Sequence, residues 1–165
     1  MEYLFLKRKK TTLTSERQKA LLFEAAERQW EEQFAGKNAN GRKVDCYIYK
    51  CILYQLEIKQ AFLDTELSLK KLSAVICTNQ TYLSNVVNKY FDCNLKELLN
   101  TYRIEYAKEL LNAGYSPMES MPECCGFASK SAFYTAFKRV AGTSPLHYLS
   151  LEKRKEVSLA TNMNI

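Results

Sequence analysis

The sequence predicts an all-α protein with two helix-turn-helix subdomains, a long linker helix between them and a helical extension at the N-terminus. First, the 165 residues include only 5 Gly and 3 Pro, which leaves few positions for long loops. Second, apolar residues recur at helical spacing along most of the chain. Third, four residues recur fifty positions later: Leu83, Val87, Asn94 and Leu98 correspond to Phe133, Phe137, Ser144 and Tyr148. This internal repeat indicates a tandem pair of similar units.

Residues 1–44 are expected to form a basic segment, an amphipathic helix and a linker. Thr14 or Ser15 can cap a helix that runs to about Phe34. One stripe of this helix is apolar: Phe23, Ala26, Trp30 and Phe34. The stripe must pack on the rest of the chain or on a second copy, so burial within the chain and a homodimer both stay open. The Gly- and Asn-rich segment 35–43 is the predicted linker.

The first residues leave two interpretations open. Residues 3–6 are apolar and residues 7–10 are basic, a pattern found at the cytosolic edge of a membrane span. Four apolar residues are far fewer than the ~20 that a spanning helix needs. The segment is therefore an ordinary basic N-terminus, or the cytosolic end of a longer membrane-anchored protein. In both cases we expect a cytoplasmic location.

The tandem domain is predicted at 45–152, with its first unit at about 66–93. A helix at 46–63 precedes this unit, which itself contains helices at 68–76 and 79–90. Asn94 and Glu97 form a capping-box pattern that starts the linker helix, assigned to 94–114. The twenty residues before Gly114, 94–113, would span about 30 Å as a helix, which is close to the ~34 Å of one turn of DNA.

The second unit is predicted at about 115–151. Ser116 with Glu119 would cap its first helix, and residues 129–141 would form its second. Ser144 would cap a last short helix that ends at Leu151. Residues 153–165 are expected to form a disordered tail.

Two stretches have the pattern of a helix that reads DNA. Such a helix needs one buried face and one face of short polar or basic groups that reach base edges. In 79–90, Leu83, Val86 and Val87 would be buried; in 129–141, Phe133, Ala136 and Phe137 would be buried. Neither stretch contains Asp or Glu, which would repel phosphate. The alternative for either stretch alone is an ordinary amphipathic surface helix.

Composition excludes little by itself, but it makes an enzyme the least expected class. The net charge of +6 is divided equally between residues 1–45 and 46–165, so bulk charge is a weak indicator of nucleic-acid binding. The six cysteines form no C-x-x-C motif, and the only histidine is His147. We therefore expect free thiols, no catalytic residues, no metal site, no cofactor and no small-molecule site.

Several motifs carry a resemblance to a known family. The first unit contains L-S-L-x-x-L-S at 67–73, Y-L-S-N-V-V at 82–87 and Y-R-I-E-x-A-K-x-L-L at 102–111. The second contains G-F-A-S-K-S-A-F-Y-T-A-F-K-R at 126–139 and G-T-S-P-L-H-Y at 142–148. Over about residues 66–150 the chain resembles the C-terminal DNA-binding domain of the AraC/XylS family of bacterial transcription regulators.

The resemblance implies that one monomer inserts two reading helices into successive major grooves of double-stranded DNA and recruits RNA polymerase as an activator. It implies eight base-contact candidates, four per unit: Gln80, Thr81, Ser84, Asn85, Lys130, Ser131, Tyr134 and Thr135. It implies four further candidates for phosphate contacts or structural roles: Lys89, Arg103, Lys138 and Arg139. For Arg103, in the linker helix, a structural role carries at least equal weight.

Two positions depart from the family pattern. The first turn usually has Gly where the backbone is left-handed, but this chain has Cys77. Either Cys77 accepts a cost of about 1 kcal/mol, or the turn has a different shape. Pro122 lies where the first helix of the second unit is expected, so that helix should be kinked, short or late in starting. A diverged protein that acts as a protein–protein interaction or dimerisation module is therefore the alternative function.

Overall fold

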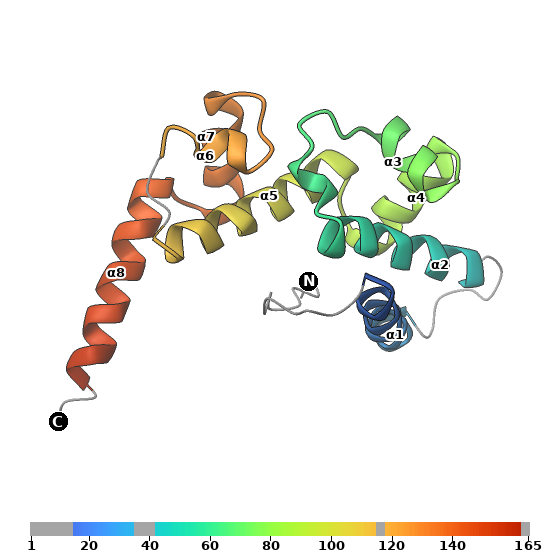
Figure 1. The fold of residues 1–165 in the computed structure, drawn as a ribbon, viewed down its shortest axis with the longest axis horizontal. Helices are drawn as coiled ribbons and strands as arrows, with labels where there is room; N and C mark the ends of the chain where they lie inside the picture. Colours follow the sequence, from blue (N-terminus) through green and yellow to red (C-terminus); the bar gives the residue numbers. More distant parts are fainter. Residues whose placement is uncertain (1–14, 35–41, 115–117, 163–165) are drawn as a thin grey trace. The chain divides into compact units, whose positions relative to one another are not determined.

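The computed structural model describes residues 15–34, 42–114 and 118–162, and within these ranges all regular structure is helical (Figure 1). The helices are α1 Ser15–Phe34, α2 Arg42–Leu53, α3 Leu69–Ile76, α4 Gln80–Phe91, α5 Leu95–Asn112, α6 Met121–Cys124, α7 Lys130–Ala141 and α8 Pro145–Asn162. A π-helical turn at Tyr54–Ile58 and a 3-10 turn at Ala61–Leu63 follow α2. The predicted all-α class is confirmed.

The chain divides into two compact units. The first contains α1 to α4, and the second contains α5 to α8 together with residues 62–65. Each unit includes a supporting helix (α2 or α5), a short helix (α3 or α6) and a reading helix (α4 or α7). The packing places α1 in the same unit as the first reading helix. The domain limits at 45 and 152 remain a prediction.

The apolar stripe of α1 packs within the first unit, where its residues are buried or half-buried. Trp30 is 6% exposed, and its ring centroid lies 5.8 Å from that of Tyr90 on α4. The Phe34 ring lies 4.9 Å from the same tyrosine, and Phe23 meets Tyr54 edge to face at 6.3 Å. Of the two alternatives for the stripe, packing on the rest of the chain or on a second copy, the structure shows packing on the rest of the chain.

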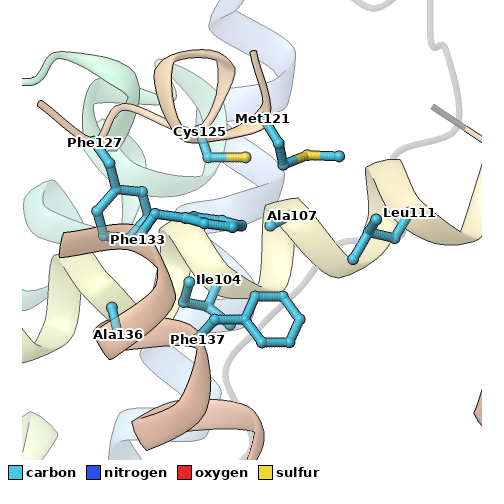
Figure 2. Packing of buried hydrophobic residues seen from close by; sticks show 9 residues of the cluster. All are labelled: Ile104, Ala107, Leu111, Met121, Cys125, Phe127, Phe133, Ala136 and Phe137. Atoms are coloured by element: carbon cyan, nitrogen blue, oxygen red, sulfur yellow. The ribbon is translucent and has the colours of Figure 1, made fainter. Parts of the chain in front are cut away.

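The core of the second unit packs aromatic side chains of α7 against aliphatic side chains of α5 (Figure 2). Phe133 and Phe137 of α7 are fully buried, and their ring centroids are 5.7 Å apart. Seven further side chains complete the cluster: Ile104, Ala107, Leu111, Met121, Cys125, Phe127 and Ala136. The first four come from α5 and α6, so this core fixes the reading helix α7 on its supporting helix.

Side-chain caps set the starts of four helices. Asn79 Oδ1 accepts a hydrogen bond from the backbone N–H of Tyr82 at 2.7 Å, and Ser68 caps α3 in the same way. Ser129 accepts from the N–H of Ala132 at 3.2 Å, and Ser144 accepts from the N–H of His147 at 3.3 Å. These caps satisfy backbone donors that a helix leaves unpaired at its N-terminus. The starts predicted for α3, α4, α7 and α8 are therefore confirmed.

Three predicted helices differ from the structure. The helix expected at 46–63 begins at Arg42 and ends at Leu53, since the chain then passes through the π turn to Gln60, which has a φ of 53°. The last helix runs to Asn162 rather than Leu151, because residues 146–162 contain no Gly or Pro to stop it. The backbone of 153–162, expected to be a disordered tail, is therefore helical.

The third difference concerns Pro122. The predicted cap Ser116 lies outside the described residues. The first helix of the second unit starts at Met121 and has four residues, with Pro122 in its first turn. Proline is tolerated there because the backbone N–H it lacks would have no helical partner. The expectation of a short, late helix is confirmed, and Pro122 leaves the core of the unit intact.

Candidate nucleic-acid interface

The reading helix of the first unit, α4, has one buried and one outward face. Leu83, Val86 and Val87 are at most 2% exposed. Gln80, Thr81 and Asn85 are exposed, and Ser84 is half-buried. The structure thus brings all four predicted base-contact candidates of this unit onto one helix, outside its core.

The reading helix of the second unit, α7, repeats this arrangement. Its buried face is Phe133, Ala136 and Phe137. All four predicted candidates on the helix are exposed: Lys130, Ser131, Tyr134 and Thr135. The Tyr134 side chain, 40% exposed, meets Phe133 edge to face at 5.5 Å. The hydroxyl is therefore carried by a ring that rests against the core.

The outward faces carry amide, hydroxyl and ammonium groups without a carboxylate. Amide side chains pair with adenine and cationic ones with guanine or phosphate. The exposed amides are on α4, at Gln80, Asn85 and Asn88, whereas Lys130 and Lys138 are on α7. The two faces thus differ in chemistry, and α7 is the more cationic.

Two of the predicted phosphate candidates are already ion-paired. Lys89 Nζ lies 3.0 Å from Asp45 Oδ2, and Arg139 pairs with Glu97 of α5. Both cations remain at least half exposed, at 50% and 67% of the side chain. Within the part of the chain that the structure describes, Lys138 is exposed and makes no ion pair.

Arg103 has the structural role that the sequence left as an alternative to a phosphate contact. It is 9% exposed, and its Nε donates a hydrogen bond to the carbonyl of Phe62 at 2.7 Å. Its Nη2 donates to the carbonyl of Asp64 at 2.9 Å. The guanidinium thus fixes residues 62–65 on the second unit.

Sequence reasoning missed one polar centre, the carboxylate of Asp45 on α2. It accepts hydrogen bonds from the Tyr82 and Tyr90 hydroxyls and from Lys89 Nζ, all on α4. Burial alone would raise the pKa of Asp45, but these three hydrogen bonds lower it below its ordinary value. The same contact raises the pKa of Tyr82 to about 12. An acid in an otherwise apolar stripe of α2 is the signal that could have indicated a buried carboxylate, although it does not identify the partners.

No helix in the described ranges combines the length and apolarity needed to cross a membrane. The six cysteines are free thiols: Cys46 and Cys125 are buried, Cys51 and Cys93 are half-buried, and Cys77 and Cys124 are exposed.

Comparisons with known proteins agree with this geometry. Residues 72–150 match a family model described as a helix-turn-helix domain. The chain is 28% identical over 86 residues to the probable transcriptional regulator LumQ of Photobacterium leiognathi, covering 52% of this chain and 35% of that protein. It is 24% identical over 102 residues to the HTH-type transcriptional regulator AdiY of Escherichia coli strain K12, covering 62% of this chain and 40% of that protein.

Among solved structures, the chain is similar to the C-terminal domain of AraT, a response regulator from Geobacillus stearothermophilus. The TM-score is 0.57 and the identity 27%, with 64% of this chain and 84% of that chain covered. The chain spans two fifths or less of the length of the two curated relatives.

Proposed function

We propose that the protein is a sequence-specific DNA-binding transcription regulator. The proposal starts from the match of residues 72–150 to a helix-turn-helix domain, which is of the AraC type. One observation carries the proposal: two helices, α4 and α7, have buried apolar faces and outward faces of polar and basic groups. Neither contains an acidic residue. A helix with these properties suits the major groove, where side chains reach base edges close to phosphates.

The proposal includes two contacts with one duplex. The helix between the two helix-turn-helix stretches, α5, has 18 residues, or about 27 Å at 1.5 Å per residue. This length supports reading helices in successive major grooves, because one turn of DNA rises ~34 Å.

A selection of bound duplexes from a random DNA library tests the proposal, followed by anisotropy titrations of the selected duplex at two salt concentrations. We expect a bipartite consensus with half-sites about one helical turn apart. A single short motif would mean that one unit reads DNA. Equal affinity for all duplexes at moderate salt would remove the proposed function.

Single substitutions test the assignment of roles. Asn85→Ala removes an exposed amide of α4 and should relax the preference at one base pair of the first half-site. Lys138→Ala should weaken binding to all duplexes and reduce the slope of log K against log salt by about 0.9. Arg154→Ala removes one charge from α8 and is the matched control for net charge. An equal change in slope for both charge variants would reject a phosphate contact at Lys138.

Activation through RNA polymerase and a cytoplasmic location are the finer parts of the proposal. The relatives LumQ and AdiY are named as transcriptional regulators, and a regulator of bacterial transcription works where the chromosome is. Transcription in vitro from a template carrying the selected site would test activation. Increased transcript is expected on addition of the protein, and a decrease would make it a repressor. The proposal assigns the chain no enzymatic activity.

A further inference from the structure

Each reading helix carries a basic residue that is ion-paired to the supporting helix of the same unit. Lys89 of α4 pairs with Asp45 of α2, and Arg139 of α7 pairs with Glu97 of α5. Lys89 and Arg139 are fifty residues apart, which is the offset of the internal repeat. Each also lies two residues before the last residue of its helix. The same position is thus ion-paired to the supporting helix in both units.

The contact in the first unit fixes α4 along its length. Asp45 Oδ2 lies 2.5 Å from the Tyr90 hydroxyl and 3.0 Å from Lys89 Nζ, while Oδ1 accepts from the Tyr82 hydroxyl. Tyr82, Lys89 and Tyr90 are at i, i+7 and i+8, so they share one side of the helix over two turns. One carboxylate therefore restrains both the rotation and the axial position of α4.

Charge and burial favour Asp45 over a DNA phosphate as the partner of Lys89. Asp45 is only 8% exposed, and without Lys89 this buried carboxylate would keep two tyrosine hydroxyls but no opposite charge. A phosphate that took Lys89 would also approach that carboxylate, and the two negative charges would repel each other. In the second unit Glu97 is the less exposed partner, at 32% against 67% for Arg139.

We propose that Asp45 and Glu97 are positioning residues that hold the two reading helices through Lys89 and Arg139, and that these two cations do not bind DNA phosphates. The inference rests on the proposed function and deepens it, because it states which basic residues neutralise DNA charge. Lys138, next to Arg139, is the exposed cation that binds phosphate. The matching position in the first unit is the exposed amide Asn88.

The salt dependence of DNA binding distinguishes the two roles. Lys138→Met should reduce the slope of log K against log salt by about 0.9, the value for one phosphate. Lys89→Met should keep the wild-type slope but reduce the ratio of specific to non-specific affinity by roughly tenfold, about the effect of losing one base contact. Lys89→Arg keeps the ion pair and should restore that ratio. A Lys89→Met slope as shallow as that of Lys138→Met would overturn the inference.

A charge exchange tests the second pair. Arg139→Glu alone places two carboxylates together and should lower site preference. Adding Glu97→Arg rebuilds the pair with reversed charges and should restore both the preference and the wild-type slope. If Arg139 binds phosphate, the double variant will bind DNA no better than the single one, which contradicts the inference.

The wild-type measurements separate failure of this inference from failure of the proposed function. A wild-type chain without a selected site would remove the proposed function itself. The other outcome is that the wild-type chain selects a site, but Lys89→Met keeps the site preference and has a shallower slope of log K against log salt. That outcome would remove only the positioning role.

Discussion

The close approach of Gly126 to residues 62 and 63 makes a sharp test of the second unit. Gly126 has a φ of +79°, and a Cβ added there would lie 2.6 Å from the Phe62 carbonyl oxygen. It would also lie 2.9 Å from both Cα and O of Leu63. These are backbone atoms, so no side-chain rotation can relieve the contacts. Gly142, with a φ of +72°, has no atom within 4 Å of such a Cβ.

Alanine at either glycine carries the backbone cost of a positive φ, but only alanine at Gly126 also clashes with neighbouring backbone atoms. An alanine in the left-handed region costs about 1–2 kcal/mol, offset by about 0.4–1 kcal/mol of reduced freedom in the unfolded chain. Gly142→Ala should therefore lower the free energy of unfolding by about 1 kcal/mol or less. Gly126→Ala must also move the Phe62 carbonyl, the acceptor of the Arg103 hydrogen bond. A lost bond to a charged group adds about 1.5–3 kcal/mol, so we expect a total of about 3 kcal/mol.

Urea unfolding followed by far-ultraviolet circular dichroism measures both variants. Gly114→Ala is a second control, since Gly114 has a φ of +77° and open space around it. We expect similar small losses at 114 and 142 and a loss at least about 1.5 kcal/mol larger at 126, the contribution of the displaced hydrogen bond. Equal losses at 126 and 142 would refute the close approach of residues 62 and 63.

Four further predictions follow from single side chains. Cys77→Gly should raise the free energy of unfolding by about 0.5–1 kcal/mol because it removes left-handed backbone strain. A lower free energy of unfolding in urea titrations would contradict this. Phe137→Ala should cost about 3–5 kcal/mol, the usual range for a buried phenylalanine, and a cost under 1 kcal/mol would mean that the core of Figure 2 is not formed. In the native protein, a thiol reagent should label exposed Cys124 but not Cys125, since Cys125 is fully buried and burial raises its pKa to about 12. Peptide mass spectrometry measures the labelled fraction of each cysteine, and equal labelling would contradict the burial of Cys125. The lowered pKa of Asp45 means that its contribution is present above the ordinary value of 3.8 and is lost as pH falls through the folded value. The stability difference between wild type and Asp45→Asn should thus be constant from pH 7 to about 5 and shrink below pH 4 in urea titrations, whereas a difference unchanged at pH 3 would refute the lowered pKa.

The sequence predicted those parts of the fold that depend on residues close together in the chain. Asn79 and Ser129 each cap a helix through the backbone N–H three residues later, so the cap and its target are visible in one short stretch. The buried face of α7 follows the helical spacing of Phe133, Ala136 and Phe137. The outward face is then determined by the same periodicity, whereas the choice of base-contact candidates on it came from the family resemblance.

The parts that sequence could not predict depend on contacts between distant residues. Asp45 and Tyr90 are 45 positions apart, and Arg103 is 41 positions from Phe62. Neither the spacing nor the residue types indicate that an acid will lie beside two tyrosines, or that an arginine will donate hydrogen bonds to backbone carbonyls. Lys89 and Arg139 were therefore assigned from the family resemblance as phosphate or structural candidates, whereas the structure shows that each charge already has a partner.

Cys77 shows how the structure decides between two alternatives that the sequence left open. Its φ of 60° and ψ of 46° are left-handed, so the turn between α3 and α4 keeps its shape without glycine. The reason lies in the hydrogen bonds around it: the N–H of Cys77 donates to the carbonyl of Ala74 at 3.2 Å, and that of Thr78 to the carbonyl of Ser73 at 2.9 Å. These bonds satisfy carbonyls that the end of α3 would otherwise leave unpaired. Because Asn79 immediately caps α4, an altered turn would lose these bonds and shift the start of the reading helix. Keeping the turn at a cost of about 1–2 kcal/mol is therefore the more stable outcome.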